Sequence, residues 1–179
     1  MALPRHRVNV LTGIKSSVEI KEAKPLGKII KKAQRPLLVI GPQALEMSID
    51  GKPFIEYLVD IATAAEIPIC ATAHTKKKLQ EMDVVPESSY DIMEILNHLK
   101  DADWKGVKGE GNHDLVLFGG FRTDLGNQGL STLKHFAPHL KTMTLCKYWY
   151  PNADFSLPNF KKDEEWKELL DSLVAELKQ

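Results

Sequence analysis

Apolar side chains recur along this chain with the spacing of helices that bury one face. In the segment 25–34, Leu26, Ile29 and Ile30 fall on one helical stripe, and the proline at its start is tolerated in a first turn. Comparable stripes predict helices at 25–34, 52–65, 88–99, 128–139 and 163–177. Ser88 or Ser89 is expected to cap the third of these helices, and Asp163 the last.

Short, unbroken apolar runs lie between the helical stripes. They occupy 37–40, 67–73, 114–118 and 143–146, and Val84-Val85 is a further candidate for a short edge strand. Continuous apolarity is typical of strands that are buried on both faces of a parallel sheet. The alternation of such strands with helices predicts an α/β fold, in which a three-layer, open parallel sheet carries helices on both faces.

The expected organisation is a single α/β domain preceded by an arm. Residues 1–24 show no sustained period and are expected to form an extended N-terminal arm, whereas 25–179 hold all the predicted elements. The long polar connection 101–113 is expected to be a surface excursion. Of the 179 residues, 43% are hydrophobic and 27% are charged, so one ordinary core is expected without a metal or disulfide.

Charge and cysteine content argue against several classes of function. Lys plus Arg and Asp plus Glu both number 24, so the basic excess of a generic nucleic-acid binder, or of a protein drawn to an anionic membrane, is missing. Cys70 and Cys146 cannot build a zinc site or an iron–sulfur cluster within this chain. Both lie in apolar runs, which favours buried free thiols and a cytoplasmic setting, and no apolar run is long enough to cross a membrane.

The predicted strand ends supply the candidate ligand site. In open α/β sheets, ligands bind beyond the carboxyl ends of the strands, where glycines let backbone N–H groups approach a phosphate. The candidate cofactor-binding residues follow three predicted strands: Gly41, Pro42, Gln43, Thr72, Ala73, His74, Gly119, Gly120, Phe121 and Arg122. The alternative is that these glycines only end strands, because the G-x-G-x-x-G fingerprint is absent and no acidic residue ends the second strand.

Histidines and carboxylates form no catalytic constellation in the sequence. His135 and His139 are spaced to share one helical face, but no glutamate pattern supports a catalytic zinc there. His74 is either a functional histidine or a surface residue that begins a basic turn, and Arg122 with Asp124 is expected to be an exposed loop ion pair. The sequence therefore assigns no catalytic residue and no metal ligand.

Aromatic residues are concentrated after the fourth predicted strand. Tyr148, Trp149 and Tyr150 are consecutive, so they cannot all face one core. Such density is typical of protein–protein contacts. A long loop held to its own domain by aromatic anchors is the alternative, and the sequence does not decide between the two.

An ordered series of segments carries a family resemblance. The segments are Arg35–Pro42, Asp114–Phe121, Asn127-Gln128, Leu130–Lys134, Leu140–Thr142, Pro151–Asp154 and Leu157–Asn159. Together they resemble the epsilon subunits of the archaeal acetyl-CoA decarbonylase/synthase complex. The resemblance covers nearly the whole chain from about Lys24 onward, and it rests on the order of the segments because no single one is diagnostic.

The resemblance implies a fold, partners and a function. The fold would be similar to the FAD/NAD-binding domain of thiamine-diphosphate enzymes (DHS-like, Rossmann-like), with a six-stranded parallel sheet. The partner would be the large alpha subunit of the carbon monoxide dehydrogenase component, which holds a nickel–iron–sulfur centre and interconverts CO and carbon dioxide. Two alpha and two epsilon chains would form this component within a complex that reversibly cleaves acetyl-CoA. The epsilon chain would stabilise the alpha dimer or help electrons pass to FAD.

Two hypotheses follow from the residues and the resemblance together. In the first, the chain is an accessory subunit, non-catalytic by itself, that contacts the large subunit through Tyr148, Trp149 and Tyr150. In the second, it is an FAD- or NAD-binding redox domain that uses the strand-end loops. The two are compatible, and a homodimer of the isolated chain is a further hypothesis because two-fold dimers are the commonest homo-oligomers.

Overall fold

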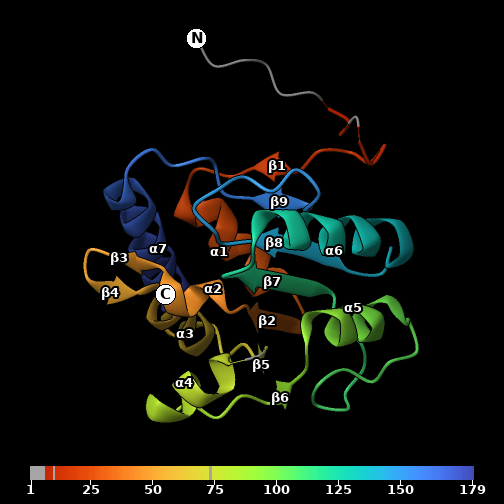
Figure 1. Ribbon diagram of the computed structural model, residues 1–179, viewed down its shortest axis with the longest axis horizontal. Coiled ribbons are helices and arrows are strands. Elements are labelled where there is room, and N and C mark those ends of the chain that lie inside the picture. Colours follow the sequence, from red (N-terminus) through yellow and green to blue (C-terminus); the bar gives the residue numbers. More distant parts are fainter. Residues whose placement is uncertain (1–6, 10, 73) are drawn as a thin grey trace.

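A parallel sheet of seven strands forms the centre of the molecule in a computed structural model, which describes residues 7–9, 11–72 and 74–179. Its strands are β1 (Val18–Glu19), β2 (Pro36–Ile40), β5 (Ile69–Ala71), β6 (Ser88–Ser89), β7 (Leu115–Gly119), β8 (Lys141–Thr144) and β9 (Phe155–Ser156). They lie in the order β1-β9-β8-β7-β2-β5-β6, and every neighbouring pair is parallel (Figure 1). The predicted α/β fold with a parallel sheet is confirmed.

Helices cover both faces of this sheet. They are α1 (Ala23–Lys32), α2 (Gln43–Glu46), α3 (Phe54–Ala64), α4 (Thr75–Glu81), α5 (Ile92–Lys100), α6 (Thr123–Phe136) and α7 (Asp163–Leu177). In Figure 1, α1, α3 and α7 lie on one side of the sheet, and α5 and α6 lie on the other. Side chains of β2 alternate between the two layers: Leu38 and Ile40 join the core under α1, α3 and α7, whereas Leu37 and Val39 join the core under α5 and α6.

The four main predicted strands form close to their expected positions. The runs 37–40, 67–73, 114–118 and 143–146 correspond to β2, β5, β7 and β8. The boundaries of β2, β5 and β7 lie within two residues of the predicted ones, and β8 begins and ends two residues before its predicted run. Every residue of β7 and all but the first residue of β2 are buried. Burial on both faces explains why a continuous apolar run marks these central strands.

The edge-strand prediction at Val84-Val85 is wrong. The strand β6 lies four residues later, where Ser88 pairs with Cys70 and Ser89 with Ala71. A two-residue edge strand needs backbone pairing but no apolar run, so its sequence carries little signal. The backbone N–H of Ile69 donates to the Glu87 carboxylate at 2.7 Å, which attaches the start of β6 to β5.

Two predicted helix caps are also wrong. The carboxylate of Asp91, and neither of the two serines, caps α5 by accepting a hydrogen bond from the backbone N–H of Glu94 at 2.8 Å. Asp163 is the first residue of α7 instead of its cap, and its carboxylate pairs with the Lys147 ammonium at 2.7 Å. The serines pair in β6 instead, and so are not available to α5.

The helix expected at 52–65 begins two residues late because a small hairpin precedes it. The strands β3 (Ser48–Ile49) and β4 (Lys52–Pro53) pair antiparallel around Asp50 and Gly51, which both have positive φ, 52° and 77°. An Asp-Gly pair with positive φ at both positions is the preferred two-residue connection of a hairpin. That dipeptide was the sequence signal for this hairpin.

The segment before α1 contributes the edge strand β1, which pairs with β9. Upstream of β1, the side-chain amide of Asn9 donates to the Asn152 side-chain oxygen at 2.8 Å. The Lys134 ammonium donates to the backbone carbonyls of Lys15 and Ala153, both at 2.7 Å. With β1 the sheet has one strand more than the six that the family resemblance implies.

The long connection between α5 and β7 is exposed along most of its length but is fixed at its end by two buried polar residues. The side-chain amide of Asn112 donates to the backbone carbonyl of Asp101 at 2.7 Å. His113 is only 5% exposed. Its Nδ1 lies 3.0 Å from the carbonyl oxygen of Arg35, and its Nε2 accepts from the Val107 backbone N–H at 3.3 Å. These partners require a neutral ring with the proton on Nδ1, because a carbonyl can only accept and an N–H can only donate.

Acidification is expected to destabilise this connection through His113. Burial holds the pKa of His113 in the folded protein below its ordinary value. The neutral ring therefore makes its full contribution to the free energy of unfolding above the unfolded-state pKa of about 6.5, and this contribution falls as the pH drops below that value. The contribution is at most about 1.4 kcal/mol per pH unit. Urea unfolding between about pH 7.5 and about pH 5 should therefore show a shallower pH dependence for His113→Gln than for wild type. The control is His135→Gln, at an exposed position; equal pH dependence in wild type and His113→Gln would contradict this assignment.

Candidate functional site

The chain reverses its direction across the sheet between β2 and β7. From β2 it passes through α3 to β5 and through α4 to β6, and then α5 leads back to β7 on the other side of β2. This reversal places a topological switch point at the carboxyl ends of β2 and β7, where open α/β sheets bind their ligands. The candidate residues after both strands therefore meet, as expected for neighbouring parallel strands.

At the switch point, backbone hydrogen bonds join the residues that follow β2 to those at the end of β7, which leaves the backbone closed to a ligand. The N–H of Gly41 donates to the carbonyl of Gly119 at 2.8 Å, and the N–H of Gln43 donates to the carbonyl of Gly120 at 2.9 Å. Both donors that a phosphate would use after β2 already have partners within the chain. The two strand ends are held against each other, and these N–H groups do not fit a pyrophosphate cradle in this conformation.

Glycine is required for this closure at two positions. A Cβ at Gly41 would lie 2.4 Å from the carbonyl oxygen of Gly120, which is too close for any side chain. Gly120 has a φ of +77°, and a Cβ there would lie 2.5 Å from the Cβ of Ala44. The close approach of the two backbones therefore gives these glycines a structural role.

The candidates after β5 are divided between the interior and the rim. Thr72 is buried, and its hydroxyl donates to the carbonyl of Ile40 at 2.7 Å. Ala73 lies outside the described residues. His74 is exposed and, with Lys77 and Lys78, lines a cleft of about 370 Å³ whose apolar wall includes Ile55. The basic run predicted as a turn is part of α4, so the sequence missed the helix that places these lysines beside His74.

The candidates after β7 also separate into a buried and an exposed residue. Phe121 is 4% exposed, its ring lies edge-on to Phe118, and its backbone carbonyl accepts from the hydroxyl of Tyr150 at 2.6 Å. Arg122 is exposed and makes two hydrogen bonds to the carboxylate of Asp124, at 3.1 and 2.7 Å. The predicted exposed ion pair is confirmed, but it lies at the start of α6 instead of in a loop, because Arg122 is the cap residue and Asp124 is in the first turn. The hydrogen bonds from Arg122 lower the pKa of Asp124. The side chains of Gln43, His74 and Arg122 are thus accessible around the switch point and form its rim. The backbone N–H groups of Gly41 and Gln43 are already hydrogen-bonded within the chain.

Comparison with known proteins gives a family. A model of the family described as CO dehydrogenase beta subunit/acetyl-CoA synthase epsilon subunit matches residues 3–174. The chain belongs to this family. The resemblance found in the sequence is thereby confirmed.

Individual members of the family match along most of their length. The acetyl-CoA decarbonylase/synthase complex subunit epsilon of Methanothermobacter thermautotrophicus is 46% identical over 148 residues, which cover 83% of this chain and 82% of that protein. Subunit epsilon 1 of Archaeoglobus fulgidus is 36% identical over 171 residues, covering 91% and 90%. The Methanothrix soehngenii subunit epsilon is 33% identical over 158 residues, covering 87% and 81%.

The two cysteines of this family member are buried free thiols. Burial raises the pKa of both, so both stay protonated near neutral pH. Around Cys146, hydrogen bonds from the backbone of Gly120 and Phe121 oppose that rise without cancelling it. The thiol therefore packs behind the switch point as a small apolar group.

The histidine pair expected to share a helical face does not do so. The helix α6 ends at Phe136, so His139 lies beyond it, and its Nε2 is 3.0 Å from the carbonyl of Leu99. Within the described parts of the chain, no group of three or more His, Cys, Asp or Glu side chains is placed to hold a metal ion.

In the same parts, no helix is long and apolar enough to cross a membrane.

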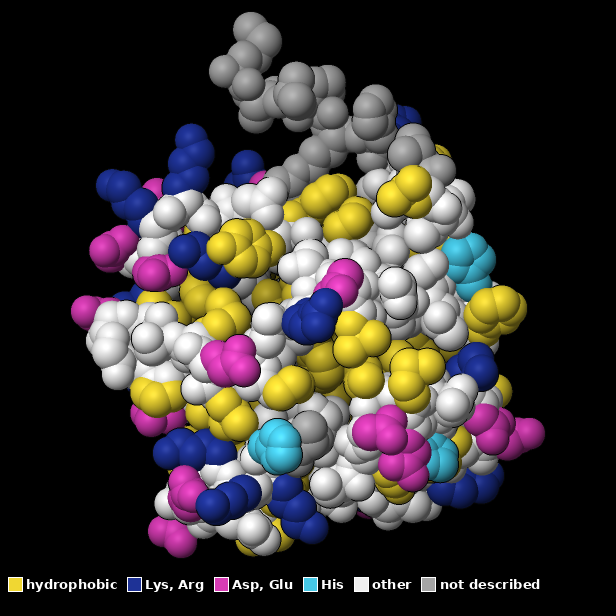
Figure 2. Space-filling view, viewed as in Figure 1, with side chains coloured by type: hydrophobic (Ala, Val, Ile, Leu, Met, Phe, Trp, Pro, Cys, Tyr) yellow, Lys and Arg dark blue, Asp and Glu magenta, His cyan; other side chains and the backbone are white. Residues whose placement is uncertain are grey.

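The three consecutive aromatic residues after β8 differ in burial, as expected because they cannot all face one core. Tyr150 is buried, Trp149 is half-buried, and Tyr148 is 51% exposed. The N–H of Trp149 donates to the Asn159 side chain at 2.8 Å, so the backbone beside Tyr148 is fixed. Figure 2 shows hydrophobic side chains gathered across the middle of the face in view, with most charged side chains around them.

Alanine at Gly120 is expected to destabilise the fold by about 2–4 kcal/mol, because it combines backbone strain with a steric clash. Gly109 is the matched control, since its φ is also positive, +76°, but a Cβ there meets nothing within 4 Å. Gly109→Ala should cost only about 1 kcal/mol. Urea unfolding of both variants measures the difference, and equal losses would show that the close contact with Ala44 is unimportant.

Proposed function

We propose that this chain acts as the epsilon subunit of an acetyl-CoA decarbonylase/synthase complex. In this role it is an accessory subunit, non-catalytic by itself, that binds the large alpha subunit of the carbon monoxide dehydrogenase component and stabilises their assembly. The observation that carries the proposal is the similarity to proteins named as epsilon subunits, which extends over more than 80% of both chains in each comparison.

The chemistry of the described residues supports an accessory role. The thiols of Cys70 and Cys146 are buried and protonated, and therefore poor nucleophiles and poor metal ligands. The switch point, where an α/β enzyme usually acts, is held shut by backbone hydrogen bonds after β2 and β7. The buried thiols and the hydrogen-bonded strand ends maintain the fold, so we assign partner binding to exposed side chains.

The aromatic segment 148–150 is the contact that we assign to the large subunit. Tyr150 anchors the segment through its hydroxyl, which donates to the carbonyl of Phe121, and Trp149 anchors it through its backbone. Tyr148 remains half-exposed on this fixed support. Tyrosines presented in this way lose little conformational entropy on binding and are frequent hot spots of interfaces.

Tyr148→Ala is expected to weaken binding of the large subunit by about tenfold or more. Phe136→Ala is the matched control, because Phe136 is 65% exposed on α6, outside the aromatic segment. Binding is measured by titrating purified large subunit with each variant, and the thermal unfolding of each free variant reports on its fold. Unchanged affinity in Tyr148→Ala would remove the aromatic segment from the interface.

Dinucleotide binding is a second candidate function, and the strand order favours it. When β1 is set aside, the six remaining strands lie in the order β6-β5-β2-β7-β8-β9. The first of them along the chain, β2, lies in the middle, the next two extend to one side and the last three to the other, which is the strand order of doubly wound dinucleotide-binding sheets. It supports the further proposal that the fold is similar to the FAD/NAD-binding domain of thiamine-diphosphate enzymes. In this second role the chain would bind FAD and help electrons reach it, or act as a free-standing FAD- or NAD-binding redox domain. Since the backbone donors are engaged, the side chains at the rim, including Arg122, would hold the phosphates.

Absorbance titration with FAD tests this second role, with and without the large subunit. Arg122→Gln should reduce FAD affinity by about fivefold or more, since it removes an exposed charge at the rim without disturbing the closed backbone. Lys100→Gln is the control, because Lys100 ends α5 and the chain runs from there to the start of β7, at the opposite end of that strand from the switch point. Absence of FAD binding in both states would exclude the flavin role and leave the accessory role intact.

A further inference from the structure

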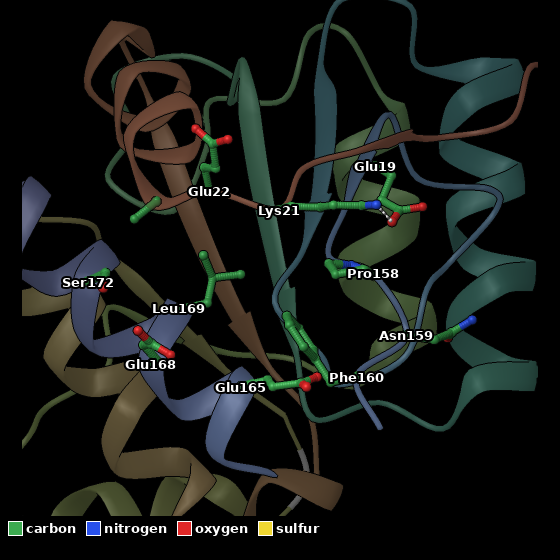
Figure 3. A pocket seen from close by; sticks show the side chains of 11 residues that line it. Glu19, Lys21, Glu22, Pro158, Asn159, Phe160, Glu165, Glu168, Leu169 and Ser172 are labelled. Carbon is green, nitrogen blue, oxygen red and sulfur yellow. Dashed lines mark ion pairs between the residues drawn. The ribbon is translucent and has the colours of Figure 1, made fainter. Parts of the chain in front are cut away.

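A second surface groove lies beside the edge of the sheet that β1 forms, beyond the carboxyl ends of β1 and β9. Its volume is about 590 Å³, which is within the range of pockets that hold a ligand or several side chains of a partner. One wall is the segment that leads from β1 into α1, another is the loop after β9, and the third is α7. Figure 3 shows the side chains that line it.

The floor of this groove is apolar. Leu169 of α7 is 7% exposed and belongs to the core under α1, α3 and α7, and Phe160 packs against the same core. Pro158 and Ala23 add further apolar surface, and both are half-buried. Such a floor offers contact to the aliphatic part of an incoming side chain, which a simple cation site would not provide.

The rim of the groove is acidic, in contrast to the neutral chain as a whole. Four glutamates line it against one lysine, Lys21, whose ammonium lies 3.4 Å from the carboxylate of Glu19. Glu22, Glu165 and Glu168 are exposed, and among the residues that the structure describes they form no ion pair. In the view of Figure 3, Leu169 lies between Glu22 and Glu168.

Local helix stability accounts for only part of this charge. Glu165 lies in the first turn of α7, where a carboxylate is favoured by the helix dipole. Glu168 lies beyond that turn, and Glu22 reaches the same groove from the residue before α1. The three carboxylates thus come from two separate elements and converge on one apolar floor.

The groove is continuous with the aromatic segment. The backbone N–H of Phe160 donates to the carbonyl of Lys147 at 3.1 Å, and the side chain of Asn159 accepts from the N–H of Trp149. One wall of the groove is therefore attached directly to the backbone on both sides of Tyr148. A partner seated on Tyr148 would lie beside the groove.

We infer that this groove binds a lysine- or arginine-bearing segment of the large subunit, which places its aliphatic stems on Phe160 and Leu169 and its charges at Glu22 and Glu168. The inference rests on the proposed function, because it names a second contact with the same partner. A cationic side chain with a long apolar stem matches both the floor and the rim. Because the contact is at the rim of an interface, its main effects are on the association rate and its salt dependence.

The test compares the double variant Glu22→Gln/Glu168→Gln with Glu94→Gln in binding to the purified large subunit. Glu94 is an exposed helical glutamate on α5, which covers the opposite face of the sheet. At about 20 mM salt, the double variant should associate about threefold to tenfold more slowly than wild type, and the difference should vanish near about 0.5 M salt. Glu94→Gln should associate at nearly the wild-type rate at both concentrations.

Equal association rates for the double variant and Glu94→Gln would overturn the groove contact. If Tyr148→Ala weakens binding while the double variant does not, the proposed function stands and only the groove contact fails. If wild type does not bind the large subunit, the proposed function itself fails. Carbodiimide coupling of the assembled complex locates the occupant: a bond from Glu168 to a lysine of the large subunit supports the inference, and a bond to a second copy of this chain overturns it.

Discussion

The pairing of β2 with β7 is the contact on which the rest of the structure depends. The two strands are in register from Pro36 with Leu115 to Ile40 with Gly119, and backbone hydrogen bonds continue the contact beyond the strands to Gln43 and Gly120. Helices shield this ladder from water on both faces, which strengthens each of its hydrogen bonds. Because the chain also changes direction here, the pairing both holds the sheet together and sets the form of the switch point.

The sequence predicts this central layer well because a strand buried on both faces must be apolar throughout. The edge strands β1 and β6, and the strand β9 beside β1, are only two residues long, and pairing of their backbones leaves little trace in the side-chain pattern. The sequence also places the candidate residues at one edge of the sheet, where β2, β5 and β7 end. It does not show that the N–H groups of Gly41 and Gln43 already have partners, because those partners lie nearly eighty residues away in the chain. The groove beside α7 is equally hidden, since its walls come from both ends of the sequence.

The proposed recognition surface and the folded core use different residues of this molecule. Residues with reactive chemistry, such as Cys146 and the phenol of Tyr150, are buried and serve packing or internal hydrogen bonds. The side chains to which we assign recognition are the exposed Tyr148, the polar rim of the switch point and the acidic groove. The loop between β8 and β9 and the loop after β9 connect the aromatic segment to the groove through backbone hydrogen bonds. A family member that works through partners needs such rigid support for its surface more than it needs a flexible catalytic pocket.

The shortness of the edge strands also affects how the protein behaves at high concentration. An exposed sheet edge is a template on which another chain can add a strand, and long, flat edges promote aggregation for this reason. Here the edge strands β1 and β6 each have two residues, so an incoming strand would find few backbone groups to pair with. The sheet therefore ends with little capacity for extension, and crowded molecules can meet through side chains without their sheets fusing.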